Sequence, residues 1–401
     1  MLLKAPIIVT MEGPPLKDHA ILVEGEKITA ILPYAQAPSN RECLELPHMV
    51  LLPGLVNAHC HLELSQLPEP LPYPGSFVLW IDQLTRLKLQ QTPEQVEAAI
   101  KSGIQQLLDG GTTTVADHLS PGTSLQPLLE SPLEGTCYLE VLGVEEQRAL
   151  HFYQQAMEKQ KAKSKKQKYK PKFKITPTPH ATYSLLPEVF AKLVSQPPPL
   201  SIHIAESAEE FLLFKEASGP LAEFLELKGK LPATICETPL QYLKRLSLLP
   251  RKGMAIHANY LEDEDVALLQ NAEMCVVHCP GSHDYFEHGR FPMGLSEDGK
   301  MNIALGTDSL ASNESLSMLR QMQLALDHYA ELTPDLAIKM ATRNGAKALL
   351  RENEIGTLKE GKLANIIGVP FRFPKRNIYE NILLNDKVQF SMIRGQVIRG
   401  L

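Results

Sequence analysis

The sequence predicts an α/β protein, a (β/α)8 TIM barrel with a small β-sandwich domain built from both chain ends. Eight short apolar segments that end in polar or reactive residues recur between residues 50 and 310, and such segments are typical of buried strands. Helix-like segments separate most of them, and strands that alternate with helices indicate a parallel sheet. Eight repeats of this kind fit a closed barrel. The two chain ends instead alternate apolar and polar residues around glycine-containing turns, which favours antiparallel strands.

The predicted barrel strands follow one another through the central part of the chain. They cover residues 50–62, 111–120, 136–143, 172–184, 200–207, 254–261, 274–282 and 302–310. Between the first two, residues 93–111 carry apolar residues at helical spacing and end at Gly110 and Gly111, a typical helix stop. In such barrels the active site lies at the C-terminal ends of the strands. Eight residues able to do chemistry lie at or near those ends: His59, His61, His118, His180, His203, His257, His278 and Asp308.

The flanking segments predict a second, smaller domain. Residues 20–32, 356–369 and 390–400 alternate apolar and polar positions around glycines, as strands of a small β-sandwich do. We therefore expect residues 1–50 and 355–401 to form a composite β-sandwich and residues 51–354 to form the barrel.

Composition limits the class of protein and its partners. The 401 residues accommodate a barrel of about 250 residues and a smaller domain. The chain is 44% hydrophobic and 21% charged, which excludes collagen-like, coiled-coil and disordered proteins. A net charge of −6 gives no general attraction for nucleic acid or anionic membranes, so we expect neither partner. Six cysteines without a CxxC pair, and no apolar run typical of a signal peptide or membrane span, predict a cytoplasmic protein.

A lysine-rich segment, residues 159–174, lies between the third and fourth predicted strands. We interpret it as a solvated helix end and loop, the usual structure of a block of like charges. A nucleic-acid patch is the alternative, but the segment lacks arginine and interleaved aromatic residues, and the whole chain is acidic.

Three histidines and one aspartate predict a metal site. His59 and His61 end the first strand, where residues two apart project to the same face. Such a pair alone is more often a core or surface feature. With His203 and Asp308 at the ends of the fifth and eighth strands, it forms a ligand set that suits one divalent metal, most simply Zn²⁺, with Fe²⁺ or Mn²⁺ also plausible. The alternative role for Asp308 is a helix N-cap.

Seven motifs carry a resemblance to a known family. In order they are PGLVNAHCHLE, PHATYS, HIAESAEE, HANYL, HCPGS, GTDSLASNESL and GTLKEGKLAN. Together they resemble the amidohydrolase superfamily, and within it the branch of adenosine, S-adenosylhomocysteine, methylthioadenosine and guanine deaminases and triazine chlorohydrolases. The resemblance implies that His59, His61, His203 and Asp308 are metal ligands. Binuclear members carry a modified lysine at the end of strand four, but Lys172 and Lys174 lie at its beginning, so we expect one metal.

The resemblance also implies catalytic roles. Glu206 corresponds to the proton shuttle, His257 to the residue that contacts the reacting water or the developing oxyanion, and His180 to a substrate contact. A bound metal lowers the pKa of its water to about 7, and Asp308 can accept the water proton. Glu206 then protonates a ring nitrogen of an aminopurine, ammonia leaves, and His257 stabilises the oxygen where charge develops.

The substrate is implied by residues 278–292 and 306–316. They look most like the aminodeoxyfutalosine deaminases of the alternative menaquinone route, so the expected reaction is metal-dependent hydrolytic deamination of this adenine-containing nucleoside. We expect Ser282, His283, Arg290 and Ser309 to contact the substrate. The alternative is that the 278–292 loop only covers the barrel mouth.

Other functions use the same scaffold, because fold and metal do not settle the substrate. The alternatives are deamination of S-adenosylhomocysteine, methylthioadenosine, adenosine or guanine, and hydrolysis of chlorinated triazines. Outside enzymes, the chain could be a barrel-based binding protein. The expected partner is a small-molecule nucleoside, and a homodimer is possible.

Overall fold

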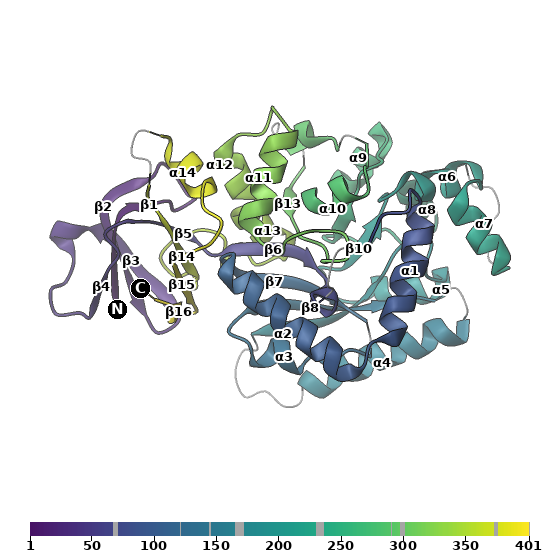
Figure 1. The fold of residues 1–401 in the computed structure, drawn as a ribbon, viewed down its shortest axis with the longest axis horizontal. Helices are drawn as coiled ribbons and strands as arrows, with labels where there is room; N and C mark the ends of the chain where they lie inside the picture. Colours follow the sequence, from purple (N-terminus) through teal and green to yellow (C-terminus); the bar gives the residue numbers. More distant parts are fainter. Residues whose placement is uncertain are drawn as a thin grey trace.

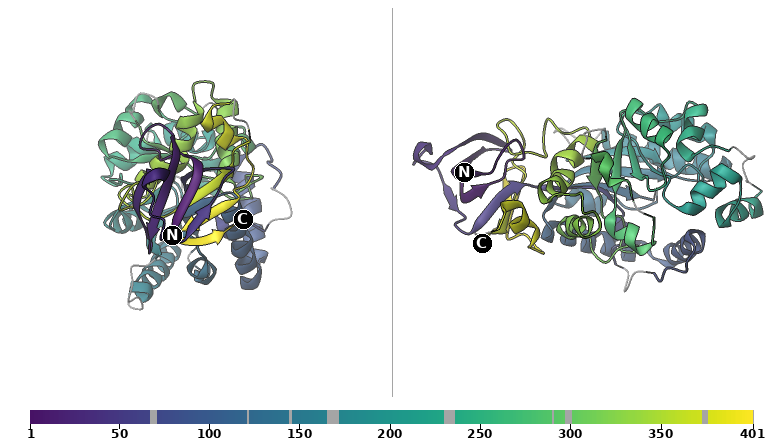
Figure 2. Two further views of the ribbon diagram at one scale, coloured as in Figure 1. Left: turned by 90° about the vertical axis from the view of Figure 1, so that its left-hand side faces the viewer. Right: turned by 90° about the horizontal axis from the view of Figure 1, so that it is seen from above.

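The computed structural model describes residues 1–66, 71–120, 122–143, 146–164, 172–229, 236–289, 291–296, 301–372 and 376–400. A β-sheet lies at one end of the molecule and a barrel wrapped by helices at the other (Figure 1). Both chain termini lie at the sheet end (Figure 2).

Eight parallel strands form the barrel. They are β6 (Leu55–Cys60), β7 (Thr112–Leu119), β8 (Glu134–Val141), β9 (Phe173–Pro179), β10 (Ser201–Ile204), β11 (Met254–His257), β12 (Cys275–His278) and β13 (Ile303–Leu305). They pair in order as two four-stranded sheets, β6 to β9 and β10 to β13. Isolated parallel bridges, Cys60 with Asp308 and Ala181 with His203, join the two sheets at both edges. The predicted barrel is therefore confirmed. Three of the eight reactive residues follow their strands, namely His61, His180 and Asp308, and the other five lie within the last two residues of theirs.

The first predicted strand is wrong in one respect, because residues 50–62 form two strands. β5 (Met49–Pro53) belongs to the other sheet, and β6 begins the barrel. Gly54 separates them at a close approach, since a Cβ there would lie 2.2 Å from Thr113 Oγ1. The chain thus passes from one sheet to the other at a position where only glycine fits.

The helices cover the outside of the barrel and follow its strands. They are α1 (Phe77–Gln90), α2 (Pro93–Asp109), α3 (Gln126–Glu130), α4 (Glu146–Ser164), α5 (Pro187–Val194), α6 (Ala208–Glu216), α7 (Pro220–Leu227), α8 (Pro239–Arg245), α9 (Asp263–Asn271), α10 (Pro280–Tyr285), α11 (Met318–His328), α12 (Pro334–Lys339), α13 (Gly345–Ala348) and α14 (Ile378–Leu383). Short helical turns occupy Tyr34–Gln36, Leu62–Leu64, Met293–Ser296 and Met340–Asn344. The predicted helix is confirmed as α2, with Thr92 and Gln95 in a capping box and Gly110 at its end.

The small β-structure at the other end is one mixed sheet of eight strands from both chain ends. Besides β5 it contains β1 (Leu2–Ile8), β2 (Leu16–Glu24), β3 (Lys27–Pro33), β4 (Cys43–Glu45), β14 (Ile366–Pro370), β15 (Phe390–Ile393) and β16 (Gln396–Arg399). Lys27, at the start of β3, pairs with Leu363 just before β14, so the sheet curls around its own apolar core. β5 spans the expected boundary after residue 50, and the division into two domains stays a prediction.

A buried carboxylate ties the sheet to the barrel. Glu134, at the start of β8, is 0% exposed and accepts hydrogen bonds from Asn365, Arg351 and Arg394. The carbonyl of Asn365 in turn accepts from the amide of Gly54, 2.9 Å away. One network therefore joins both chain ends to the barrel wall.

The lysine-rich segment begins as expected, within a helix end. α4 continues to Ser164, while residues 165–171 lie outside the described part of the chain. Lys172 and Lys174 lie at the beginning of β9, and Lys174 Nζ donates to the carbonyl of Pro198, 2.8 Å away. Across the described ranges, none of the helices has the length and apolarity needed to span a membrane.

Candidate metal centre and active site

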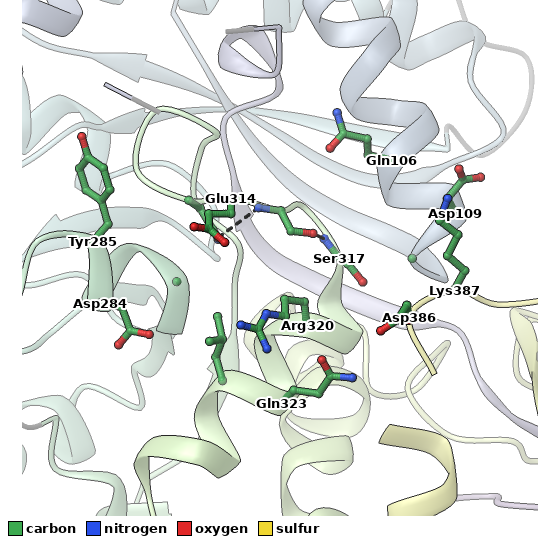
Figure 3. Close-up of a pocket in the computed structure, with 15 residues that line it drawn as sticks. Gln106, Asp109, Asp284, Tyr285, Glu314, Ser317, Arg320, Gln323, Asp386 and Lys387 are labelled. Carbon is green, nitrogen blue, oxygen red and sulfur yellow. Dashed lines mark hydrogen bonds between the residues drawn. The ribbon is translucent and has the colours of Figure 1, made fainter. Parts of the chain in front are cut away.

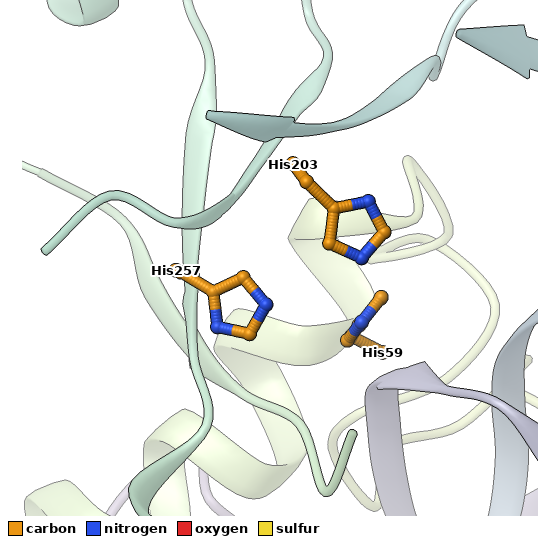
Figure 4. A group of neighbouring side chains, drawn as sticks. All are labelled: His59, His203 and His257. Carbon is orange, nitrogen blue, oxygen red and sulfur yellow. The ribbon is translucent and has the colours of Figure 1, made fainter. Parts of the chain in front are cut away.

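The four predicted ligands meet at the C-terminal rim of the barrel. Asp308 Oδ1 lies 3.6 Å from His59 Nε2 and 3.7 Å from His61 Nε2. The ring of His203 lies 4.8 Å from that of His59, centroid to centroid. Figure 4 shows the rings of His59, His203 and His257 converging from three different strands. Residues far apart in sequence therefore offer ligand atoms to one region, in which His59 lies close both to His61 and Asp308 and to His203 and His257.

Backbone carbonyls orient two of these imidazoles. His61 Nδ1 lies 3.1 Å from the carbonyl of His118, and His203 Nδ1 lies 3.0 Å from the carbonyl of His180. A carbonyl oxygen can only accept, so each Nδ1 carries the proton and each Nε2 keeps its lone pair. This arrangement is how proteins fix the tautomer of a metal-binding histidine.

Two serines and the backbone orient the aspartate. Asp308 Oδ2 accepts hydrogen bonds from Ser282 Oγ, 2.7 Å away, and Ser312 Oγ, 2.9 Å away, which leaves Oδ1 beside the histidines. Burial raises the pKa of Asp308, but the neighbouring His59, followed by His257 and His61, outweighs it and holds the pKa well below its ordinary value. In the described chain after Asp308 the first helix is α11, so the helix N-cap alternative does not apply.

The chemistry of the set fits one divalent metal. His59 is 0% exposed, and neither of its ring nitrogens has a hydrogen-bond partner among the described residues. Burial lowers its pKa, so the ring is neutral, the form that binds metals. Two ligands about 2.1 Å from a tetrahedral zinc lie about 3.4 Å apart, close to the 3.6 and 3.7 Å that separate Asp308 Oδ1 from the two histidines.

Glu206 and His257 lie beside this set. Glu206 follows β10, and its Oε1 lies 3.4 Å from His257 Nε2 at the end of β11. Burial, followed by the charge of Asp308, raises the pKa of Glu206 well above its ordinary value. The raised pKa favours the protonated carboxyl group, the form that can donate a proton.

The backbone around Glu206 is held on both sides. Its amide donates to Glu210 Oε2, 2.8 Å away, and its carbonyl accepts from Asn259 Nδ2, 2.9 Å away. Glu210 Oε1 also accepts from the hydroxyl of Thr182, 2.5 Å away, in the loop after β9. The side chain of Glu206 thus projects from a fixed backbone position.

His180, expected to contact substrate, lies against the metal centre. Its ring centroid is 4.9 Å from that of His203, and its Nδ1 lies 2.9 Å from Ser184 Oγ. Burial lowers the pKa of His180 to about 3, so the ring is neutral. A neutral imidazole at this point can exchange hydrogen bonds with a purine ring.

Of the other four residues expected to contact substrate, three are hydrogen-bonded within the protein and one lies outside the described residues. The hydroxyl of Ser282 is engaged with Asp308. His283 is buried with Nδ1 3.2 Å from Asn259 Oδ1, and Ser309 is buried with its hydroxyl accepting from the amide of Ala311 at 3.3 Å. Arg290 lies outside the described residues. Substrate contacts by these four residues stay predictions.

Three buried carboxylates near the site were missed by sequence reasoning. Glu140, at the end of β8, has Oε1 3.5 Å from His203 Nδ1, and Asp117 in β7 accepts from the amide of Leu62 at 2.8 Å. The third is Glu210. Asp117 and Glu140 lie near the C-terminal ends of the second and third strands, so the rule applied to the histidines would have identified them.

An aromatic cluster covers one side of the rim. Phe77 and Trp80 of α1 pack on Phe286 just after α10, with ring centroids 5.3 and 4.8 Å from that of Phe286. Glu209, one residue before Glu210 in α6, accepts hydrogen bonds from the amides of Phe77 and Val78 at 2.8 and 3.1 Å. The start of α1 is therefore fixed to the helix that follows Glu206.

A separate cavity of about 750 Å³ lies between α2, α10 and α11 (Figure 3). Charged side chains of both signs line it, among them Asp284, Glu314, Arg320 and Lys387. None of the predicted ligand or catalytic residues lines this cavity.

Comparison with known proteins agrees with this fold. Residues 50–398 match the model of the amidohydrolase family. The 5-methylthioadenosine/S-adenosylhomocysteine deaminase of Pyrococcus horikoshii is 27% identical over 99% of this chain and 94% of its own length. The zinc-bound adenosine deaminase of Xanthomonas campestris superposes with a TM-score of 0.84 at 23% identity, covering 100% of this chain and 92% of that one. The aminofutalosine deaminase of Helicobacter pylori gives 0.86 at 22% identity, covering 99% of both chains. The chain therefore belongs to the amidohydrolase family of enzymes.

Proposed function

We propose that the protein hydrolytically deaminates an adenine-containing nucleoside, with one divalent metal, most simply Zn²⁺, as cofactor. The observation that carries the proposal is the convergence of Asp308 with His59 and His61, at 3.6 and 3.7 Å, beside the buried pair of Glu206 and His257. The relatives named as deaminases along almost the whole chain support the same reaction class.

His59, His61, His203 and Asp308 would hold the metal. When bound, it supplies a water whose pKa is lowered to about 7. The hydroxyls of Ser282 and Ser312 hold Asp308 Oδ2 and so fix the carboxylate that would both bind the metal and take a proton from that water.

Glu206 and His257 would handle proton and charge on the substrate. The buried Glu206 carboxyl would donate its proton to the ring nitrogen next to the amine-bearing carbon. The proton that Asp308 takes from the water would then pass to the amino group, which leaves as ammonia while the hydroxyl proton returns to Glu206. His257 donates a hydrogen bond to the oxygen where negative charge develops, which is worth about 3 kcal/mol for a single donor of this type. His180 orients the purine ring.

For the substrate we infer aminodeoxyfutalosine, from the resemblance of residues 278–292 and 306–316. The second class of candidate substrate comprises 5-methylthioadenosine and S-adenosylhomocysteine. These are the substrates named for the relatives that match at 27 to 28% identity. Both classes share the adenine ring and differ in the group on the 5′ carbon.

Ammonia release from a substrate panel tests the proposal. The panel contains aminodeoxyfutalosine, 5-methylthioadenosine, S-adenosylhomocysteine, adenosine, guanine and a chlorinated triazine. We expect the highest kcat/KM for aminodeoxyfutalosine. A higher value for another adenine nucleoside would refute the substrate but keep the reaction, whereas no ammonia from any adenine nucleoside by the metal-loaded protein would refute the reaction itself.

A further inference from the structure

A groove of about 720 Å³ opens beside the metal centre on the side of α1 and α2. Its walls come from the end of α1, the start of α2, the loop after β7, and α3 and α4. Glu63 and Ser120 line it, and each lies two residues after a histidine of the centre, His61 and His118. Because His61 is also bonded to the carbonyl of His118, the groove adjoins the metal centre along two chain segments, although none of the predicted ligands lines it.

The groove carries more positive than negative charge. Lys88 and Lys159 line it, whereas Glu63 is the one acidic residue among its described lining residues. Lys88 Nζ donates to Glu63 Oε1, 2.5 Å away, and to Ser120 Oγ, 2.8 Å away. Lys159 Nζ donates to the carbonyl of Thr123 at 2.6 Å. Two ammonium groups thus face a single carboxylate.

Both lysines keep hydrogen-bonding capacity for a ligand. Within the described residues Lys88 donates to two acceptors and Lys159 to one, whereas an ammonium group carries three donors. Glu63 has no such capacity to spare, because the hydroxyls of Ser120 and Thr123 and the amide of Ser120 also donate to it. An anion that enters the groove therefore meets donors.

The opposite wall is apolar. Val96 of α2, Leu125 before α3 and Leu129 of α3 line the groove. An inorganic anion would gain little from this wall, whereas a carboxylate on an aromatic or aliphatic group buries apolar area there at about 25 cal/mol per Å². A zwitterion with an ammonium group beside its carboxylate would bind less tightly, because the two lysines repel that ammonium group.

We propose that this groove is the subsite for the far end of the substrate, an apolar 5′-substituent that ends in a carboxylate, with Lys88 and Lys159 as its specificity-determining residues. The proposal rests on the proposed deaminase function, since the adenine ring must lie at the metal centre for the substituent to reach the groove. It assigns the carboxylate to the lysines in place of Arg290.

The ratio of two kcat/KM values tests the subsite. Its numerator is measured with aminodeoxyfutalosine, which carries a carboxylate, and its denominator with 5-methylthioadenosine, which does not. Lys159→Met should lower this ratio about tenfold, as loss of one hydrogen bond to a charged group implies, and Lys159→Arg should restore most of it. Lys17→Met, which removes an exposed lysine of β2, is the matched control and should leave the ratio unchanged. An unchanged ratio in Lys159→Met, or a tenfold fall in Arg290→Met alone, overturns the proposal.

Direct binding separates failure of the subsite from failure of the deaminase function. Benzoate and its uncharged analogue benzamide are titrated calorimetrically into the metal-loaded wild type, Lys159→Met and Lys159→Arg. Tighter binding of benzoate than of benzamide, lost in Lys159→Met and kept in Lys159→Arg, supports the subsite even if no nucleoside is deaminated. Equal binding of the two probes to the wild type overturns it. A rise or fall in kcat for 5-methylthioadenosine on adding benzoate would show a separate regulatory anion site and would also overturn it.

Discussion

Replacing the buried carboxylate of Glu210 by an amide should make the protein less sensitive to alkaline pH. Glu210 is 0% exposed, and burial raises its pKa from the ordinary 4.5 to about 7 against the lowering effect of the Thr182 and Glu206 hydrogen bonds. The unfolded chain keeps the ordinary value. The contribution of Glu210 to folding is therefore complete below pH 4.5 and declines as the pH rises through about 7.

The magnitude follows from this difference in pKa. Between pH 5 and pH 8 the wild type loses about 2.5 kcal/mol that a neutral side chain at position 210 would not lose. With 401 residues and about 2.1 cal/mol/K of unfolding entropy per residue, this corresponds to about 3 °C in Tm. Glutamine fits the position, because its carbonyl oxygen can accept from the Glu206 amide and its amide group can donate to the Thr182 hydroxyl.

Scanning calorimetry at the two pH values measures this effect. The Tm of Glu210→Gln minus the Tm of the wild type should be about 3 °C more positive at pH 8 than at pH 5. Other titrating groups affect both proteins alike, so their effects cancel in this difference. Glu216→Gln removes an exposed carboxylate from the same helix and serves as the control for loss of charge. A difference in Tm that stays constant or moves in favour of the wild type would refute the reasoning.

Four further measurements test the site and the fold. Elemental analysis of the purified protein should find one divalent metal per chain, and two would contradict a mononuclear site. His59→Ala and Asp308→Ala should lose metal and activity together, whereas Glu206→Gln should keep the metal and lose activity by orders of magnitude; metal loss in the last variant would exclude a shuttle role. Deletion of residues 160–170 should leave kcat for 5-methylthioadenosine nearly unchanged, because a connection from helix to strand lies opposite the catalytic rim and this substrate has no carboxylate for Lys159 to bind. A large fall with fold and metal intact would contradict this. Glu134→Gln should lower Tm by about 5 °C, since removing one partner of a buried ionic network costs about 3–5 kcal/mol, and an unchanged Tm would show that the network is not stabilising.

Local sequence signals were sufficient to predict most of the barrel. The helix α2 could be bounded closely because its capping residue, the proline of its first turn and the glycine after it are neighbours in sequence. The two strands β5 and β6 could not be separated, because the break at Gly54 depends on Thr113, which lies 2.2 Å from a Cβ built there. An apolar run interrupted only by a proline and a glycine reads as one strand unless its partners are known.

The ligand residues could be grouped from sequence because parallel strands end at one rim of a barrel. The residues that hold these ligands and Glu206 in place could not be predicted in this way. The hydroxyl of Ser312 lies 2.9 Å from Asp308 Oδ2, and the carboxylate of Glu210 joins Thr182 to the Glu206 amide. The bond between Thr182 and Glu210 joins segments after different strands. The other two bonds span only four residues, but no periodicity marks the residues that make them.

The backbone conformation at the strand ends could also not be predicted from the sequence. This conformation links the stability of the barrel to the geometry of the site. Ala205, His257 and Asp308 all have positive φ, at 52°, 67° and 56°. A non-glycine residue in this region is strained by about 1 kcal/mol or more, so each one is held by its surroundings. Asp308 is held by its parallel bridge with Cys60, the contact that joins β13 to β6. The strain that turns its carboxylate toward the histidines is thus sustained by the same contact that closes the barrel. A substitution that weakens the contact between Cys60 and Asp308 should therefore lower the affinity for metal under conditions in which the protein is still folded.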